Sequence, residues 1–258
     1  MLFRSFDLPY GKDYWQKIDI YLPADPSLTG LPVFLCIHGG GWTHGYKEWM
    51  GFQAPPIVAF PAIFVSVSYR LAPAATFPAP LDDCLDALAW VHRNIARHGG
   101  DPNRIFIGGH SAGAHLSALV TLRRDLFAGR GLPPDVIKAC LPFSGVYSFD
   151  FDDCAASGAK LLGDTRERKA ANPLDHVAGN RTPFYVTWAK NERPPIIGSS
   201  ERFVAALRQQ PGRVEQYLFE DFDHFYIHLD MQRAENLWVR TLRAWMTGDP
   251  ATAQMPAA

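Results

Sequence analysis

The sequence predicts an α/β protein built around a mostly parallel sheet with helices on both faces. Short runs of β-branched and aromatic residues alternate with longer segments of helical periodicity. Some of these runs are apolar throughout, as strands buried on both faces are. Strands that alternate with helices form a mostly parallel sheet, and its ligands bind at the carboxyl ends of the strands.

The expected strands are short and follow one another along the chain. Residues 18–22 (IDIYL) alternate apolar and polar side chains, which is typical of a half-exposed strand. Residues 33–38 (VFLCIH) and 62–67 (AIFVSV) are continuous apolar runs and predict buried strands. Further strands are expected at residues 104–108, 139–144, 184–188 and 214–219.

Helices are expected between these strands. In residues 81–98 apolar side chains recur on one face, with a proline before the segment and two glycines after it. Other helices are expected at residues 112–123, 199–209 and 231–247. We expect residues 1–247 to form a single domain, because a chain of this length can bury one large core. Residues 248–258, rich in alanine and proline, are expected to form a frayed tail.

Composition narrows the classes of function. The chain has 25 basic and 26 acidic residues, so no excess of positive charge favours nucleic acid as a partner. No apolar run of about 18 residues predicts a membrane span, and the first residues lack the apolar region of a secretory signal. The cysteines form neither a CxxC pair nor a zinc-ligand spacing, so reduced thiols in a cytoplasmic protein are expected. They are Cys36, Cys84, Cys140 and Cys154.

The segment GHSAG, residues 109–113, matches the G-x-S-x-G pattern of a nucleophilic serine. It follows an expected strand and opens an expected helix, which is the context in which the pattern is meaningful. The glycines let the two backbones approach closely, and the helix N-terminus directs its N–H groups toward a developing oxyanion. Ser111 is therefore the candidate nucleophile. The alternative is a helix-capping serine in a glycine-rich turn.

The segment HGGGW, residues 38–42, directly follows the first buried strand. It matches the glycine loop that supplies oxyanion donors in esterases, where glycines leave N–H groups directed into a pocket. We expect Trp42 to line this pocket and His38 to bind the loop backbone. The expected oxyanion donors are the N–H groups of Gly40, Gly41 and Ala112. A flexible glycine turn is the alternative.

A serine nucleophile needs a neighbouring base, and the base needs an orienting acid. In α/β-hydrolases the chain order is serine, acid, histidine. His224 comes just after the expected strand at residues 214–219 and is the candidate base, with His228 as second choice. His115 lies one turn beyond Ser111 in the same helix and is not expected to face it.

The acid is expected to follow the strand at residues 184–188. Glu192 lies there and is the candidate, since a glutamate can accept the hydrogen bond that holds the histidine tautomer. Aspartate is the commoner residue at such a site. Asp221 and Asp223 are alternatives, and a solvated turn carboxylate is the non-catalytic interpretation of Glu192.

These motifs resemble the esterase/lipase group of α/β-hydrolases, especially the branch with kynurenine formamidases and bacterial feruloyl-esterase-like proteins. The resemblance implies an α/β-hydrolase fold with an eight-stranded type of sheet, and Ser111, Glu192 and His224 as the triad. Formamidase-like members have aspartate at the position of Glu192. The matching stretches cover nearly the whole chain: IDIYLP (18–23), HGGGW (38–42), SYRLAP (68–73), GDPNR (100–104), GGHSAGAHL (108–116), FSGV (143–146), AKNERPPIIGSS (189–200) and DHF (223–225).

No long insertion follows residues 139–144, so residues 147–160 are expected to form only a small cap. Nearby aromatic residues predict an acyl or aryl pocket. The expected pocket residues are Trp42, Tyr69, Phe143 and Tyr147, of which Phe143 fits the core equally well.

These features predict a serine hydrolase that cleaves a small carboxylic ester, or an aryl or N-acyl amide, through an acyl-enzyme. An arylformamidase is the alternative among enzymes, and a catalytically inactive hydrolase-fold binding protein is the alternative outside them. No metal or organic cofactor is expected. The expected partner is a small-molecule substrate, without nucleic acid or membrane, and a homodimer through the last strand or helix would be ordinary.

Overall fold

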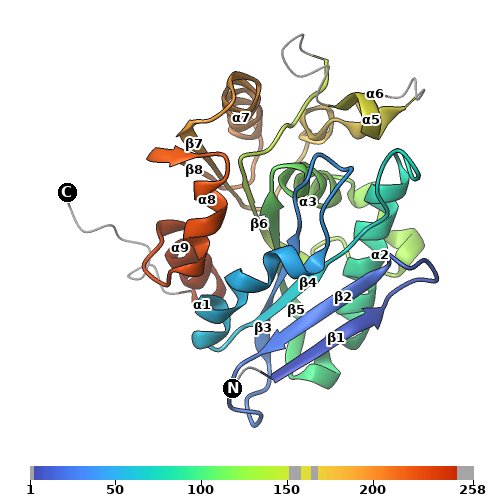
Figure 1. Cartoon of the computed structure of the whole chain (residues 1–258), viewed down its shortest axis with the longest axis vertical. Coiled ribbons are helices and arrows are strands. Elements are labelled where there is room, and N and C mark those ends of the chain that lie inside the picture. Colours follow the sequence, from blue (N-terminus) through green and yellow to red (C-terminus); the bar gives the residue numbers. More distant parts are fainter. Residues whose placement is uncertain (1–2, 151–157, 164–167, 249–258) are drawn as a thin grey trace.

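The computed structural model describes residues 3–150, 158–163 and 168–248, which form an eight-stranded sheet with helices on both faces (Figure 1). The strand order is β1-β2-β4-β3-β5-β6-β7-β8. Strands from β4 to β8 in this order pair in parallel, whereas β2 pairs antiparallel with both β1 and β4. The strands are β1 (Phe3–Pro9), β2 (Lys17–Leu22), β3 (Leu31–Ile37), β4 (Ile63–Val67), β5 (Gly100–His110), β6 (Ile137–Phe143), β7 (Phe184–Asn191) and β8 (Val214–Asp223).

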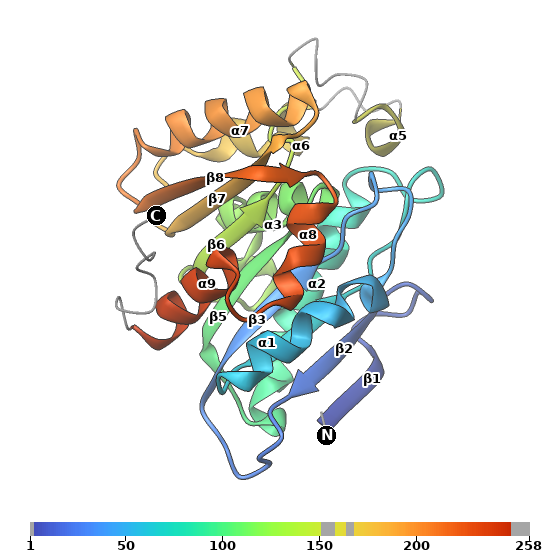
Figure 2. The same cartoon turned by 60° about the vertical axis from the view of Figure 1, so that its left-hand side comes forward.

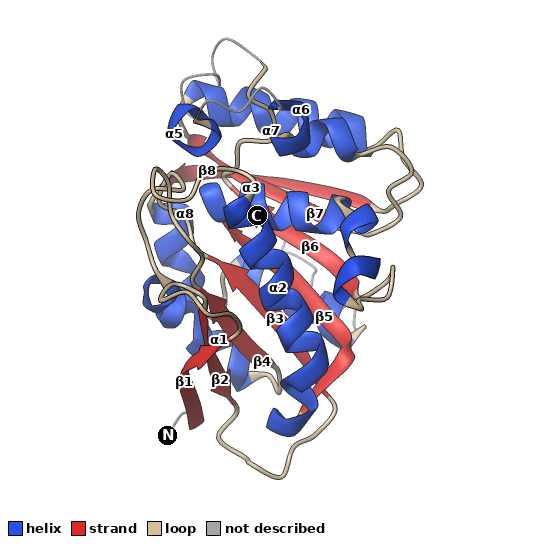
Figure 3. Cartoon of the chain, turned by 90° about the vertical axis from the view of Figure 1, so that its right-hand side faces the viewer, coloured by secondary structure: helices blue, strands red, loops and turns tan. Residues whose placement is uncertain are grey.

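Helices connect the strands and cover both faces of the sheet. The α-helices are α1 (Ala54–Ala59), α2 (Ala79–Asn94), α3 (Ala112–Leu122), α5 (Ala159–Leu162), α6 (Arg168–Ala171), α7 (Pro194–Leu207), α8 (Tyr226–Leu229) and α9 (Leu237–Thr247). The 3-10 helices are η1 (Lys47–Gln53), η2 (Ile95–His98), η3 (Arg124–Leu126), η4 (Ala128–Arg130), η6 (Pro173–His176) and η7 (Asp230–Gln232). Helices α2, α3 and α7 lie on one face, and α1, α8 and α9 lie on the other (Figures 2 and 3).

Strand β3 shows how the sequence builds two cores. All seven of its residues are buried. Because side chains alternate along a strand, Val33 and Leu35 pack into the core under α2 and α3, whereas Phe34 and Cys36 pack into the core under α1 and α9. The apolar run therefore places β3 in the middle of the sheet, next to β5.

The structure confirms the predicted fold class, an eight-stranded, mostly parallel sheet between helices. Some elements differ from the prediction. Strand β1 and helix α1 were not predicted, and β5 begins at Gly100 rather than residue 104. Helix α7 begins at Pro194 rather than residue 199, and the last helix begins at Leu237 rather than residue 231. The last helix starts late because the side chain of Asn236 accepts the N–H of Trp238 at 2.8 Å and caps it.

Parts of two expectations lie outside the described residues. These are the tail at residues 249–258 and residues 151–157 of the expected cap. Within the described ranges, no helix combines the length and the apolar composition that crossing a bilayer requires.

Candidate active site

Ser111 sits on a strained turn between β5 and α3. Its backbone has φ 54° and ψ −115°, a conformation that residues other than glycine rarely adopt. The turn lies close against β3. A Cβ at Gly109 would lie 2.2 Å from the carbonyl oxygen of Ile37, and a Cβ at Gly113 would lie 2.0 Å from it. Both glycines of the G-x-S-x-G pattern are therefore required by the close approach of β3.

Ser111, His224 and Glu192 form a continuous hydrogen-bonded chain. Nε2 of His224 lies 3.1 Å from Oγ of Ser111, and its Nδ1 lies 2.9 Å from Oε2 of Glu192. The carboxylate of Glu192 is fully buried, and its Oε1 accepts the backbone N–H of Arg193 at 3.0 Å. With Nδ1 donating to the carboxylate, Nε2 is free to accept the proton of the serine.

The three residues come from the carboxyl ends of three strands. Ser111 follows β5, Glu192 follows β7 and His224 follows β8. The sequence-predicted nucleophile, base and acid are thus brought together. The alternative acid Asp223 instead accepts the N–H groups of Phe225 and Tyr226, at 2.9 and 2.7 Å.

His110 holds the backbone of His224, the candidate base, through a hydrogen bond. Its Nε2 donates to the backbone carbonyl of His224 at 2.8 Å, and the two rings lie 4.6 Å apart. Burial, together with the neighbouring His228 and His224, lowers the pKa of His110 well below its usual value. His110 is therefore a neutral donor that fixes the backbone of the candidate base. In the sequence, His110 occupies only the variable position of the serine motif, which gave no signal of this role.

The glycine loop bends sharply beside Ser111. Gly40 has φ 118° and Gly41 has φ 59°, and a Cβ on Gly40 would lie 2.1 Å from the carbonyl oxygen of His44. As expected, His38 binds the loop backbone, donating from Nδ1 to the carbonyl of Gly39 at 2.7 Å. Among the described residues, the N–H groups of Gly40 and Gly41 have no hydrogen-bond acceptor.

A cavity of about 270 Å³ opens beside Ser111. It is lined by the three loop glycines, Ser111 and His224, so the candidate nucleophile, base and oxyanion donors share one space. Ala112 is the first residue of α3, where a backbone N–H has no partner within the helix. The lining residues are Gly39, Gly40, Gly41, Trp49, Met50, His110, Ser111, Arg193, His224, Phe225 and His228.

The four aromatic residues predicted to line the pocket lie elsewhere, and this corrects the sequence-based expectation. Tyr69 stacks on His38 with ring centroids 4.3 Å apart, and Tyr147 stacks on Phe203 at 4.1 Å. Each of the four is at least nine-tenths buried, and none is among the described residues that line the cavity. They are core residues because their rings pack against other side chains.

The other two rings pack on residues near the turn that carries Ser111. Trp42 donates from Nε1 to Nδ1 of His115 at 3.2 Å. Phe143 stacks on His110 at 5.4 Å and meets Trp238 edge-on at the same distance. Both therefore support the turn from within the protein.

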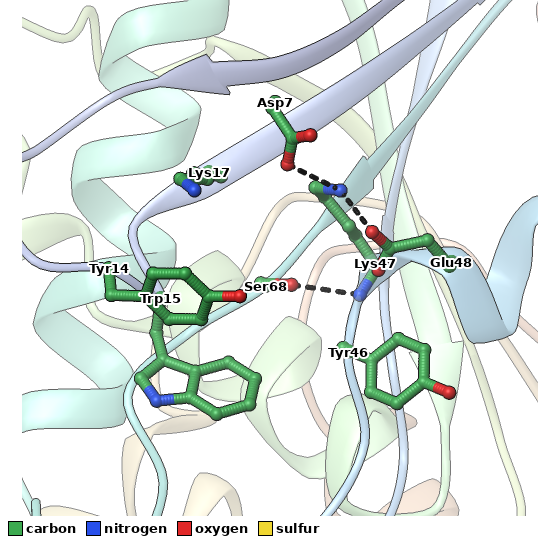
Figure 4. Close-up of a pocket in the computed structure, with 8 residues that line it drawn as sticks. All are labelled: Asp7, Tyr14, Trp15, Lys17, Tyr46, Lys47, Glu48 and Ser68. Atoms are coloured by element: carbon green, nitrogen blue, oxygen red, sulfur yellow. Dashed lines mark hydrogen bonds and ion pairs between the residues drawn. The ribbon is translucent and has the colours of Figure 1, made fainter.

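A second cavity, of about 360 Å³, lies near the carboxyl end of β4 and does not include Ser111. Figure 4 shows Tyr14 and Trp15 on one side of it and Tyr46 on the other. The nearly buried ammonium group of Lys47 forms ion pairs there with the carboxylates of Asp7 and Glu48 (Figure 4).

Lys47 anchors the chain that follows the glycine loop. Its Nζ lies 3.0 Å from the carboxylates of both Asp7 and Asp19. Its backbone N–H donates to Oγ of Ser68 at 2.8 Å, and its carbonyl accepts the hydroxyl of Ser66 at 2.6 Å. Burial opposes the charge on Lys47, but its bonds to carboxylates raise its pKa above the usual value. The charged side chain thus fastens this segment to β1 and β2, and its backbone carbonyl fastens it to β4.

Comparison with known proteins agrees with this architecture. The family model BD-FAE matches residues 18–207. Esterase LipQ of Mycobacterium tuberculosis is 32% identical over 83% of this chain and 55% of its own length. The kynurenine formamidase of Salmo salar is 27% identical over 86% of this chain and 74% of its own length.

A solved structure described as a truncated carbohydrate esterase from gut microbiota superposes with a TM-score of 0.82. It is 18% identical to this chain, with 96% of each chain covered. The chain spans about half the length of the mycobacterial relatives that it matches. This chain belongs to the BD-FAE family and has the α/β-hydrolase fold of the esterases that it resembles.

Proposed function

We propose that the protein is a serine carboxylesterase that cleaves small carboxylic esters through an acyl-enzyme on Ser111. The observation that carries this proposal is the hydrogen-bonded chain from Glu192 through His224 to Ser111, which opens into a cavity beside free backbone N–H groups. Similarity to esterases supports the same reaction.

In the first step, Oγ of Ser111 attacks the ester carbonyl carbon while Nε2 of His224 takes the hydroxyl proton. The carboxylate of Glu192 stabilises the resulting imidazolium. The carbonyl oxygen becomes an oxyanion, and the N–H groups of Gly40, Gly41 and Ala112 stabilise it. His224 then gives its proton to the leaving alcohol as the carbon–oxygen bond breaks.

In the second step, water hydrolyses the acyl-enzyme. His224 takes a proton from the water, whose oxygen attacks the acyl carbon through the same oxyanion site. The bond to Oγ then breaks, the proton returns to Ser111, and the carboxylic acid leaves. Each residue thus performs the same task in both steps, so one rigid arrangement serves the whole reaction.

The test is hydrolysis of 4-nitrophenyl acetate by the wild-type protein and by Ser111→Ala. We expect turnover by the wild type and a loss of nearly all activity in a variant that keeps its fold, measured by circular dichroism. Equal turnover by the two proteins would contradict the mechanism. A fluorophosphonate probe separates an enzyme from an inactive binding protein, because the probe does not label an inactive scaffold.

An arylformamidase is the second candidate. The observation in its favour is the match to kynurenine formamidases, which spans 86% of this chain. Ser111, His224 and Glu192 would cleave an N-formyl aryl amine by the same two steps, with His224 giving its proton to the leaving amine. Parallel assays of an N-formyl aryl amine and a 4-nitrophenyl ester distinguish the two, since a formamidase has the higher kcat/KM on the amide.

A further inference from the structure

His228 is one of three histidines in the wall of the cavity beside Ser111, and the proposed mechanism gives it no task. Its ring stacks on the ring of His110, with centroids 4.8 Å apart and planes at 12°. Phe52 meets the same ring edge-on at 4.7 Å. These contacts hold the imidazole in one orientation.

Gln53 sets the tautomer of His228. Nε2 of this fully buried glutamine lies 3.1 Å from Nδ1 of the histidine. An amide nitrogen only donates, so Nδ1 of His228 accepts and the ring proton lies on Nε2. The neutral ring therefore carries its only N–H on the nitrogen that does not face Gln53.

Two sulfur atoms fix the orientation of the glutamine amide. The thiol of Cys36 donates to Oε1 at 3.6 Å, and Sδ of Met231 accepts from Nε2 at 3.8 Å. Burial raises the pKa of the Cys36 thiol, so it keeps its proton and remains a donor. The amide nitrogen of Gln53 is thus directed toward His228.

The charge state of His228 agrees with this tautomer. Burial, and then the nearby His224, lower its pKa to about 4. The ring is therefore neutral near pH 7. Within the described part of the chain no residue accepts a hydrogen bond from Nε2 of His228, although the ring lines the cavity. This N–H is left for a group that enters the cavity.

The position of His228 indicates which half of the substrate it would meet. The ring of His110 contacts both His224, at 4.6 Å, and His228, at 4.8 Å, so the three imidazoles form one cluster. His224 must protonate the leaving alcohol. A donor grouped with His224 therefore suits the alcohol half, whereas the glycine loop provides donors for the reacting carbonyl.

We propose that Nε2–H of His228 donates a hydrogen bond to a second oxygen in the alcohol half of the substrate. The inference rests on the proposed ester hydrolysis and adds a substrate class: esters of alcohols that carry an ether or hydroxyl oxygen near the ester group. His228 contacts the substrate, and Gln53 is a positioning residue that acts through it.

The test compares kcat/KM for 2-methoxyethyl acetate and butyl acetate, which differ by one oxygen in place of one methylene. The measured quantity is kcat/KM for 2-methoxyethyl acetate divided by kcat/KM for butyl acetate in the same protein. A variant with reduced overall activity can therefore still be compared with the wild type. In His228→Phe the ratio is expected to fall about 3- to 10-fold, the effect of one neutral hydrogen bond. In His228→Gln, whose amide nitrogen can reach the position of Nε2, most of the ratio is expected to remain.

Two further variants separate hydrogen bonding from packing. Gln53→Met removes the donor to Nδ1, so we expect the ratio to fall a fewfold. His98→Phe makes the same ring substitution in η2, which precedes β5 at the opposite end from Ser111, and we expect no change in the ratio. An unchanged ratio in His228→Phe overturns the inference while leaving the esterase proposal intact. If the wild type hydrolyses neither ester and no fluorophosphonate labels Ser111, the proposed function itself fails and the inference fails with it.

Discussion

Replacing Glu192 by glutamine changes one atom of a buried carboxylate and tests its proposed role as the acid that orients His224. Oε1 of Glu192 accepts the N–H of Arg193 at 3.0 Å, so the amide oxygen of the variant is expected to keep this position. The amide nitrogen then takes the position of Oε2, 2.9 Å from Nδ1 of His224. Oε1 also lies 2.8 Å from Nδ1, but the hydrogen bond of the imidazole is to Oε2. Because the amide nitrogen at that position donates, Nδ1 is expected to become an acceptor, and the ring proton then moves to Nε2.

The wrong tautomer stops the base from working. Nε2 of His224 then presents an N–H to Oγ of Ser111, 3.1 Å away, and cannot accept the serine proton. The imidazolium of the transition state also loses its buried counter-charge. We expect kcat to fall about 10⁴-fold, which corresponds to about 5 kcal/mol in the activation barrier. KM is expected to change little, because Glu192 does not line the cavity.

Steady-state hydrolysis of 4-nitrophenyl acetate measures this effect, with burst titration to count active sites. Glu192→Asp keeps the charge and shortens the side chain, so an intermediate kcat is expected. Asp221→Asn is the matched control, because this exposed alternative acid is expected to leave kcat unchanged. A fall in Glu192→Gln of less than about tenfold, or an equal fall in Asp221→Asn, would refute the reasoning.

Three further predictions concern the loop, its anchor and a buried histidine. Gly40→Ala places a Cβ 2.1 Å from the carbonyl oxygen of His44, so the loop must shift, and kcat is expected to fall about 10²- to 10³-fold as oxyanion donors move. Lys47→Met leaves the buried carboxylate of Asp19 without its cation, so the free energy of unfolding in urea is expected to fall by about 3 kcal/mol. His115 accepts from Trp42 and donates to a carbonyl, and burial lowers its pKa to about 4. The folded state therefore binds this proton less readily than the unfolded state, so stability is lost as pH falls from about 6.5 toward 4.

Each of these predictions has a control and a contradicting result. For the loop, Gly129→Ala adds a Cβ in open space, so a kcat loss as large as that of Gly40→Ala would contradict the oxyanion argument. For the anchor, Lys190→Met breaks an exposed pair, so the free energy of unfolding is expected to fall much less than in Lys47→Met. For the histidine, urea unfolding of the wild type and of His115→Gln is measured at pH 7 and pH 5. The wild type is expected to lose about 2 kcal/mol more unfolding free energy between these pH values than the variant does. If stability falls equally with pH in the two proteins, protonation of His115 does not contribute to the pH dependence.

Much of the fold was predictable from local patterns. Continuous apolar runs place β3 and β4 inside the sheet, because a strand covered on both faces has no polar side. Strand β1 was missed because it is an antiparallel edge strand with a polar sequence, FRSFDLP, and its pairing with β2 is a long-range contact. The start of α7 was missed although Pro194 and Pro195 are a start signal, because the prediction relied on apolar periodicity.

The candidate reacting residues were predictable where chemistry restricts the residue type and the turn restricts its neighbours. Ser111, Glu192 and His224 each follow a strand, so strand assignment alone placed them at one edge of the sheet. The pocket walls were not predictable in this way. An aromatic residue after a strand can face the core or the cavity, and periodicity does not decide between the two.

The residues missed in the cavity wall had weaker signals. Trp49 and Phe225 are exposed aromatic residues close in sequence to the glycine loop and to His224, and this proximity was the available indication. The role of Gln53 depends on contacts with residues far away in the chain, such as His228 and Met231. Only the folded structure brings these together.

The most direct test of the central claim is to trap the reaction on its nucleophile. The protein is treated with a 4-nitrophenyl phosphonate ester, and the modified peptide is identified by mass spectrometry. We expect a single phosphonyl adduct on Ser111 that forms in step with the loss of esterase activity, and no adduct in His224→Ala on the same timescale. An adduct on another residue, or full inhibition without modification of Ser111, would contradict the account.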